Sequence, residues 1–186
     1  MIYFRNLLYN IVKYVSKSGV SMNINTTYTK IITGEDLMET AQHGSTLYPF
    51  QFYYEDLSVF DFNCIEWHWH TELEFIYIES GTVTLWIGED QFNLTEGNGI
   101  FINTKVIHRL YSPSKALIPN FVFMPSFIAP CDSLIYQKYI LPIISSSLPF
   151  LVFHKKVCWQ AKVLSIMRQI ISAPDSVLSK VRLTRA

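Results

Sequence analysis

Three histidines and one glutamate carry the clearest chemistry in this sequence. His68 and His70 are two residues apart, Glu74 follows four residues later, and His108 lies on a later segment. On a strand, residues two apart point to the same face, so both imidazoles share one side. A sheet that curls into a barrel would bring the four side chains together. Two or three imidazoles with one carboxylate suit a divalent transition metal that keeps open positions for water or substrate.

The same residues have a second interpretation, as polar groups in a pocket for an organic effector. Strand alternation places Ile76 beside Glu74 and Leu110 beside His108, and the ring of Trp86 offers a flat apolar surface. The candidate effector-binding residues are His68, His70, Glu74, Ile76, Trp86, His108 and Leu110. For the aromatic residues the alternative is ordinary core packing. Within hydrogen-bond distance, Glu74 would favour a charged imidazolium and so a pH-sensitive pair.

Short apolar or alternating runs between residues 27 and 125 predict the strands that carry these side chains. Turn signals such as Ser80-Gly81 and Glu96-Gly97-Asn98 separate them. The predicted strands are Phe50–Tyr54, Cys64–His70, Leu73–Glu79, Val83–Ile87, Gly99–Ile102, Ile107–Tyr111 and Asn120–Met124. Many short strands with regular turns indicate a β-sandwich or barrel. The expected fold class is therefore mostly β with C-terminal α-helices.

Helical patterns follow Pro130. One segment spans Leu134–Ile144 and a second runs from about Val157 to Ser172, before Ala173-Pro174. The apolar stripe of the second helix includes Trp159, Val163, Ile166 and Ile170. This stripe predicts either a helix that covers the barrel or a dimerisation seam formed by a helix pair. Asp175 is placed to cap a third helix that continues to Ala186.

The two ends of the chain differ from its middle. Residues 1–21 carry basic residues, no acid and an apolar stripe at helical spacing. That stripe predicts a helix packed on its own domain or on a partner subunit, with a membrane-surface helix as the alternative. Met22 is a second candidate start. Residues 22–154 are acidic and residues 155–186 basic, so an acidic body lies between basic ends.

Composition narrows the class of protein. The 186 residues are 49% hydrophobic and 16% charged with a formal net charge of zero, which excludes intrinsic disorder and argues against a strong nucleic-acid binder. Three widely spaced cysteines without a CxxC pair predict reduced thiols and a cytoplasmic location. The sequence has no uncharged apolar run of about 18 residues, so we expect no spanning helix.

The histidine region resembles the cupin superfamily. The first cupin motif is HxH, three residues, Glu, six residues, Gly, and His68, His70, Glu74 and Gly81 match it throughout. Phe62 stands where a glycine usually precedes the motif. In the second motif Gly97 and His108 match, while Asn103 replaces the proline, Lys105 the glycine and Ser112 the asparagine. The resemblance implies a double-stranded β-helix, or jelly-roll barrel, followed by two or three helices.

The flanking residues are similar to the effector-binding domain of AraC-type transcription regulators. The similarity lies in Trp67–Gly81 and in Gly97–Asn103 leading to His108. It implies a sensor module that binds a small-molecule effector, with a sugar as one candidate, and forms a homodimer. DNA would be bound only by a helix-turn-helix part absent from this chain. The expected domains are an extension (1–21), a cupin-like β-barrel (22–130) and a helical dimerisation and linker segment (131–186).

Two functional hypotheses therefore stay open. The sensor hypothesis needs no cofactor and no catalytic residue. The alternative is a stand-alone metal-dependent cupin enzyme of the dioxygenase or isomerase type. In that enzyme His68, His70, Glu74 and His108 would hold one Fe, Mn, Ni or Zn ion. A purely structural β-domain would not explain why costly polar groups occupy inward positions.

Overall fold

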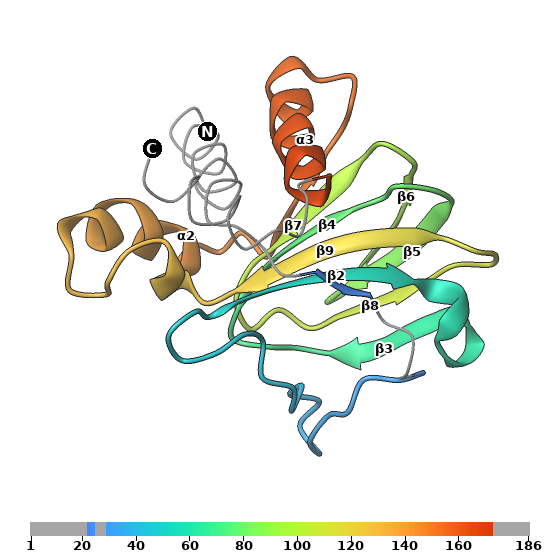
Figure 1. Ribbon diagram of the computed structural model, residues 1–186, viewed down its shortest axis with the longest axis horizontal. Coiled ribbons are helices and arrows are strands. Elements are labelled where there is room, and N and C mark those ends of the chain that lie inside the picture. Colours follow the sequence, from blue (N-terminus) through green and yellow to red (C-terminus); the bar gives the residue numbers. More distant parts are fainter. Residues whose placement is uncertain (1–21, 25–28, 173–186) are drawn as a thin grey trace.

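A computed structural model of the chain describes residues 22–24 and 29–172 (Figure 1). Two β-sheets pack face to face. The larger sheet has the strand order β1-β2-β9-β4-β7-β10 and the smaller one β3-β8-β5-β6. The strands are β1 Met22–Ile24, β2 Phe50–Asp56, β3 Cys64–His68, β4 Leu73–Tyr77, β5 Thr82–Ile87, β6 Asp90–Thr95, β7 Gly99–Ile102, β8 His108–Tyr111, β9 Leu117–Phe123 and β10 Phe150–Phe153. The expectations for residues 1–21 and for the segment from Asp175 lie outside the described residues.

The predicted fold class, a mostly β barrel followed by helices, is confirmed. β1 pairs with β2 in parallel, and the other paired strands are antiparallel. All seven predicted strands are present, with ends shifted by up to three residues. The sequence did not predict β1, β6 or β10. β6 forms a hairpin with β5, and Gly88 in the connecting turn has a φ of +56°, a backbone conformation that glycine adopts without strain.

The larger sheet is buried on both faces. Its inner face packs against the smaller sheet, where Ile76, Ile100 and Leu85 belong to one apolar cluster. Its outer face carries the phenylalanine cluster, defined as Phe50, Phe75, Phe121 and Phe123. Phe75 and Phe121 stack with ring centroids 5.2 Å apart. The two faces are covered along β4 and β7, where every residue is buried rather than every second one.

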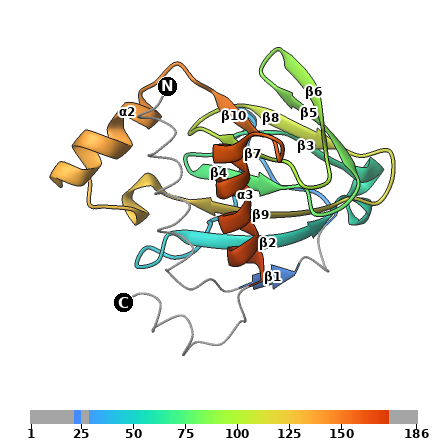
Figure 2. The ribbon, with the colours of Figure 1, turned by 90° about the horizontal axis from the view of Figure 1, so that it is seen from above.

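Helix α3, Cys158–Ile171, covers the outer face of this sheet (Figure 2). Val163, Ile166 and Ile170 are buried against the phenylalanine cluster, and Trp159 packs edge-on against Phe153. Of the two predictions for this apolar stripe, a helix that covers the barrel is therefore what the structure shows. The dimerisation seam predicted for the same stripe stays a prediction.

The other helical elements are short. The predicted helix Leu134–Ile144 contains a π-helical turn, Tyr136–Ile140, followed by α2, Leu141–Ile144. Pro142 lies in the first turn of α2 and has no N–H to donate to the preceding turn, which explains the irregularity. Asn103 donates hydrogen bonds from Nδ2 to the carbonyl oxygens of Ile143 and Leu148, and so ties this region to the end of β7. Among the described helices, none has the length and apolar character that a membrane span requires.

β10 changes the expected division of the chain. The sequence predicts a helical segment over 131–186, but Phe150–Phe153 pairs antiparallel with β7 and extends the larger sheet. A four-residue apolar run after Pro149 is too short to separate strand from helix by periodicity alone. Residues Phe150–Phe153 form a strand because the free edge of β7 offers them backbone hydrogen bonds. Residue 130 is therefore not the end of the barrel.

Candidate functional site

Antiparallel pairing brings the three histidines and the glutamate together. His68 ends β3 and pairs with His108 at the start of β8, and their ring centroids are 4.1 Å apart. His70 follows β3, and Glu74 lies in β4. The nitrogen ligand atoms of His68, His70 and His108 all lie within 4.8 Å of one another. Each of the four side chains is nearly or completely buried.

Backbone carbonyls set the orientation of two imidazoles. His68 Nδ1 lies 2.8 Å from the carbonyl oxygen of Glu66, and His108 Nδ1 lies 2.9 Å from that of Val106. A carbonyl only accepts, so Nδ1 donates in both rings and Nε2 is left for the cluster. Burial, together with the neighbouring His108, holds the pKa of His68 well below its usual range. This orientation is typical of histidines that bind metals.

Glu74 is the negative centre of the cluster. Its Oε2 lies 3.1 Å from His108 Nε2 and 3.3 Å from His70 Nε2. Burial alone would raise the pKa of Glu74, but hydrogen bonds and charges from His108 and His70 outweigh it and lower that pKa. A buried carboxylate among imidazoles needs one compensating positive charge. The cluster can meet that need with a proton on an imidazole or with a bound cation, so its donor set fits a divalent transition metal.

Two positions that depart from the cupin motifs keep the backbone conformation of glycine. Phe62 and Lys105 stand where glycine is expected, and their φ angles are +58° and +60°. Phe62 is 90% exposed and precedes β3, which ends at His68. Lys105 donates its N–H to the carbonyl oxygen of His70 over 2.8 Å. The chain therefore keeps the turns that aim the histidines, at the cost of left-handed backbone in non-glycine residues.

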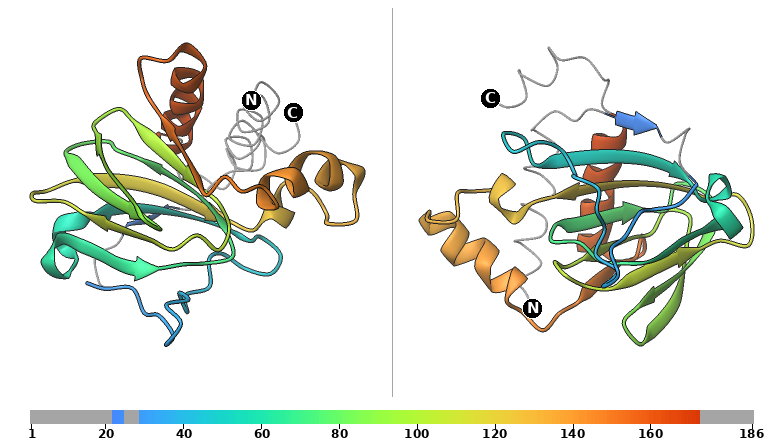
Figure 3. Two further views of the ribbon diagram at one scale, coloured as in Figure 1. Left: turned by 180° about the vertical axis from the view of Figure 1, so that it is seen from behind. Right: turned by 90° about the horizontal axis from the view of Figure 1, so that it is seen from below.

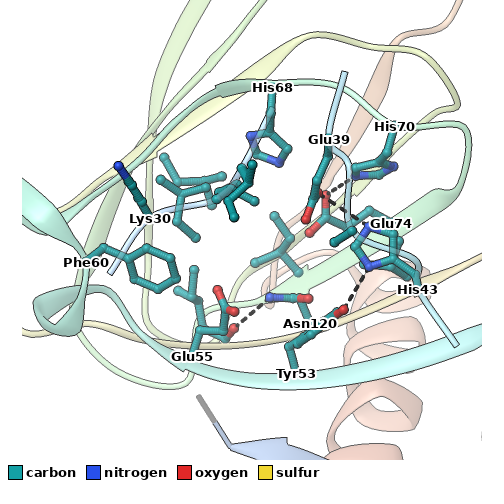
Figure 4. A pocket seen from close by; sticks show the side chains of 18 of the residues that line it. Lys30, Glu39, His43, Tyr53, Glu55, Phe60, His68, His70, Glu74 and Asn120 are labelled. Atoms are coloured by element: carbon teal, nitrogen blue, oxygen red, sulfur yellow. Dashed lines mark hydrogen bonds and ion pairs between the residues drawn. The ribbon is translucent and has the colours of Figure 1, made fainter. Parts of the chain in front are cut away.

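A cavity of about 420 Å³ opens beside the cluster (Figure 4). His68, His70, Glu74, Ile76 and Leu110 line it, as expected. His108 is fully buried behind them and contacts Glu74. The remaining lining residues are Lys30, Ile31, Ile32, Glu39, Thr40, Ala41, His43, Tyr53, Glu55, Phe60, Ile65, Ile118, Asn120 and Val122.

The prediction that Trp86 lines the pocket is wrong, because this residue lies outside the cavity. Val83, Leu85 and Ile87 of β5 face the barrel interior, so Trp86 lies on the opposite face. There the guanidinium carbon of Arg109 lies 4.8 Å from the centroid of the Trp86 ring. The aromatic residues Tyr77, Phe101, Phe121 and Phe123 are also outside the cavity, in the core beneath α3. Core packing therefore describes these four residues.

The polar lining residues that were not predicted from the sequence are Lys30, Glu39, Thr40, His43, Tyr53, Glu55 and Asn120. His43 Nδ1 lies 2.8 Å from the Tyr53 hydroxyl and His43 Nε2 lies 3.4 Å from Glu39. Burial lowers the pKa of His43, but Glu39, Glu72 and Glu74 together raise it above its ordinary value. A signal existed in β2, where Gln51, Tyr53 and Glu55 alternate with Phe50, Phe52 and Tyr54. For His43, in a loop, the spacing offered no signal.

Residues 29–43, here called the cover segment, run across the barrel beside this cavity (Figure 3). Backbone hydrogen bonds join the segment to Trp69, which lies between His68 and His70. Glu39 N–H donates to the Trp69 carbonyl oxygen over 2.9 Å, and Trp69 N–H donates to Leu37 over 3.1 Å. The indole Nε1–H of Trp69 donates to the carbonyl oxygen of Asp36. The cover segment and the histidine cluster are therefore directly connected.

Comparisons with known proteins agree with this architecture. Residues 64–118 match the protein family described as "Cupin domain". An uncharacterised HTH-type transcriptional regulator, YdeC of Bacillus subtilis (strain 168), is 24% identical over 143 residues, which are 75% of this chain and 48% of the regulator. The chain thus spans about half the length of that curated relative.

Solved structures that are similar to this chain cover a smaller share of it than the curated regulator does. An RmlC-like cupin from Shewanella frigidimarina is 17% identical, with 41% of this chain and 67% of that chain covered and a TM-score of 0.37. A predicted oxalate decarboxylase from Thermotoga maritima is 16% identical, with 33% and 56% covered and a TM-score of 0.31. The residues that match the cupin family include His68, His70, Glu74 and His108.

Proposed function

We propose that this chain is the effector-sensing module of an AraC-type transcription regulator. The observation that carries the proposal is the similarity to an HTH-type transcriptional regulator over 143 residues. That stretch is longer than the residues 64–118 that match the cupin family, so it extends beyond the cupin match. In the proposal the effector is a small organic molecule, the module forms a homodimer, and DNA is bound by a part outside this chain.

The cover segment supports a sensing role. It supplies Lys30, Glu39 and His43 to the cavity, and its hydrogen bonds to Trp69 connect it to the histidine cluster. A ligand in the cavity would contact the barrel and the cover segment together. Such a ligand favours whichever position of the segment gives it more contacts, and this coupling is what a sensor needs.

A metal-dependent enzyme is the second candidate, and one observation favours it. The Nδ1 atoms of His68 and His108 are held by backbone carbonyls, as in metal-binding histidines. His68, His70, Glu74 and His108 would hold the ion. A bound divalent metal would polarise a substrate or activate water or O2. The residues themselves would orient the site and exclude water from it.

Thermal unfolding separates the two candidates. The 186-residue chain would be unfolded with EDTA, with Mn²⁺, Ni²⁺ or Zn²⁺, and with a panel of sugars, and its metal content would be measured after purification. A sensor gains stability from an organic ligand in EDTA, by about 2.7 kcal/mol at a ligand concentration of 100 Kd. An enzyme carries about one metal per chain and loses it in His70→Ala but not in the exposed control His154→Ala.

The regulator assignment has its own test in the gene. We expect the reading frame beyond the codon for Ala186 to continue with two helix-turn-helix patterns and a basic balance. A stop codon directly after Ala186 would contradict the regulator proposal and make the metal content the deciding measurement.

A further inference from the structure

We infer that the cavity takes a neutral, mostly apolar molecule that carries a hydroxyl group, an alcohol in chemical terms, and that this hydroxyl binds the phenol of Tyr53. The inference rests on the proposed function, since it names the chemical class of the effector. It is carried by the mutual pairing of the ionisable groups in the cavity, by the apolar wall, and by the hydrogen-bonding capacity of the Tyr53 hydroxyl.

The ionisable groups beside the histidine cluster are paired with one another. Glu74 lies 3.3 Å from His70, and Glu39 lies 3.4 Å from His43. A ligand ion would have to leave water for this buried site, where the groups that could compensate its charge already have partners. The pairing therefore favours a neutral ligand over an ion of either sign.

Apolar side chains form a wall of the cavity. Ile65 of β3, Leu110 of β8 and Val122 of β9 line it and are at most 5% exposed. Glu55 and Asn120 lie in the same lining, and Figure 4 shows that they point toward each other. An apolar body gains free energy when this wall removes it from water, whereas a hydroxyl placed against the wall loses its hydrogen bonds to water. The wall therefore favours a largely apolar molecule over a polyol.

The hydroxyl of Tyr53 is the hydrogen-bonding position for the ligand. Tyr53 lines the cavity from β2, and its hydroxyl lies 2.8 Å from Nδ1 of His43. A phenol has one donor site and two acceptor sites, so the bond to His43 leaves capacity for a further partner. Burial raises the pKa of Tyr53, and the charges of nearby carboxylates, Glu39 foremost, raise it further. The phenol therefore keeps its proton at neutral pH.

A hydroxyl group suits this position in either arrangement of the bond between Tyr53 and His43. Where Tyr53 donates to Nδ1, its oxygen offers only acceptor sites, and the ligand must donate. Where Nδ1 carries the proton and donates to Tyr53, the phenol proton is left for the ligand, which must accept. A ketone can only accept, whereas a hydroxyl group does both.

The experiment compares probes that differ in one functional group. Menthol, menthone and menthylamine share one carbon frame, cyclohexanol, cyclohexanone and cyclohexylamine form a smaller series, and glucose is the polyol. Binding of each to the 186-residue chain would be measured by calorimetry at pH 7 in EDTA, so that no divalent metal takes part. We expect the alcohol of at least one series to bind about fivefold more tightly than its ketone, its amine and glucose, as one hydrogen bond allows.

Variants locate the effect at the phenol. Tyr53→Phe is expected to weaken binding of the alcohol about fivefold and to remove its preference over the ketone. Tyr54→Phe is the matched control on the same strand, because the Tyr54 hydroxyl bonds to Glu79 outside the cavity, and it should leave that preference unchanged. If Tyr53→Phe does not fold, Val122→Thr tests the wall and should weaken binding of the alcohol about threefold.

Three outcomes would overturn the inference: a ketone, amine or polyol that binds as tightly as the alcohols, a Tyr53→Phe variant without effect on them, or no binding of any probe up to about 10 mM. Tight binding of glucose with Tyr53→Phe silent would exclude the alcohol class while the sensing proposal stands. A stop codon directly after Ala186 together with alcohol-selective binding would contradict the regulator proposal and leave the inference in place.

Discussion

The two faces of the larger sheet use the same strands for opposite purposes. The outer face of β2, β4 and β9 carries the phenylalanine cluster beneath α3, whereas the inner face of the same strands carries Tyr53, Glu55, Glu74 and Asn120. Neighbouring residues on one strand therefore belong either to the core or to the cavity. Because side chains alternate with a period of two, a slip of one residue would exchange the two sets. The comparison predicts that substitutions on the outer face alter stability, and substitutions on the inner face alter binding.

The largest effect is expected from Phe121→Ala on the outer face. Phe121 is 1% exposed and contacts Phe50, Phe75 and Phe123. Loss of the ring should lower the free energy of unfolding by about 3–5 kcal/mol, measured by urea denaturation. Phe62→Ala, at a residue 90% exposed, is the control and should change little. If Phe121→Ala does not fold, Phe121→Leu should show a smaller loss. If Phe121→Ala changed ligand preference and left stability unchanged, the proposed division between a structural outer face and a binding inner face would be wrong.

On the inner face, Glu74→Ala should lower stability less and affect binding more. The substitution removes the carboxylate that faces His70 and His108 and leaves buried imidazole nitrogens without that partner. We expect a loss of about 1–3 kcal/mol in the free energy of unfolding. If Zn²⁺ or Ni²⁺ binds the native chain in calorimetry, its affinity for Glu74→Ala should be lower. Unchanged binding of every cavity probe and metal would show that Glu74 is only structural.

The positive φ angles predict a stabilising change. Phe62→Gly should raise the free energy of unfolding by about 0.5–1 kcal/mol, because glycine adopts a φ of +58° without strain and the exposed ring loses few contacts. Lys105→Gly, at a φ of +60°, should act in the same direction. Thermal and urea unfolding measure both variants. Destabilisation by both would show that these side chains contribute more than their backbone conformation costs.

Trp86→Ala tests the outward position of that residue. The expected loss of stability is about 0.5–1 kcal/mol, from the contact with Arg109. Binding of cavity probes should stay within about twofold of the unchanged chain, a difference of under 0.5 kcal/mol. A large loss of binding would restore Trp86 to the effector site.

The smallest effect concerns pH. Burial raises the pKa of Asp56, but hydrogen bonds from Ser58 and the Lys115 ammonium, 3.2 Å away, lower it below its ordinary value. A lowered folded-state pKa stabilises the protein above the unfolded pKa of about 3.9, and the stabilisation is lost as pH falls through the folded value. At pH 6 the native chain should therefore be about 0.5–1 kcal/mol more stable than Asp56→Asn, and this difference should shrink as the pH falls through the folded-state pKa. In the control variant, Glu89→Gln, the free energy of unfolding should depend on pH in the same way as in the native chain. A difference in unfolding free energy that stays constant with pH would argue against Asp56 as the titrating group.

Local patterns were sufficient to predict most strands and helix α3. The spacing of His68, His70 and Glu74 also places these residues on one inward face, because strand alternation needs no tertiary contact. The alternation of Thr82, Thr84 and Trp86 with Val83, Leu85 and Ile87 already indicates an outward Trp86. The prediction that Trp86 lies in the pocket was based only on its aromatic ring and did not take the alternation along β5 into account. Polar β6 carried too weak an apolar pattern to be predicted.

What the sequence by itself determined is which residues share a face, because strand and helix periodicities are local properties of the backbone. Only the tertiary structure decided what covers each face. It placed α3 on the chain's own sheet, added β10 to the edge of β7, and brought His43 and Glu39 over the cavity. These contacts join segments far apart in the chain, and they depend on which edges and surfaces remain free once the barrel has closed.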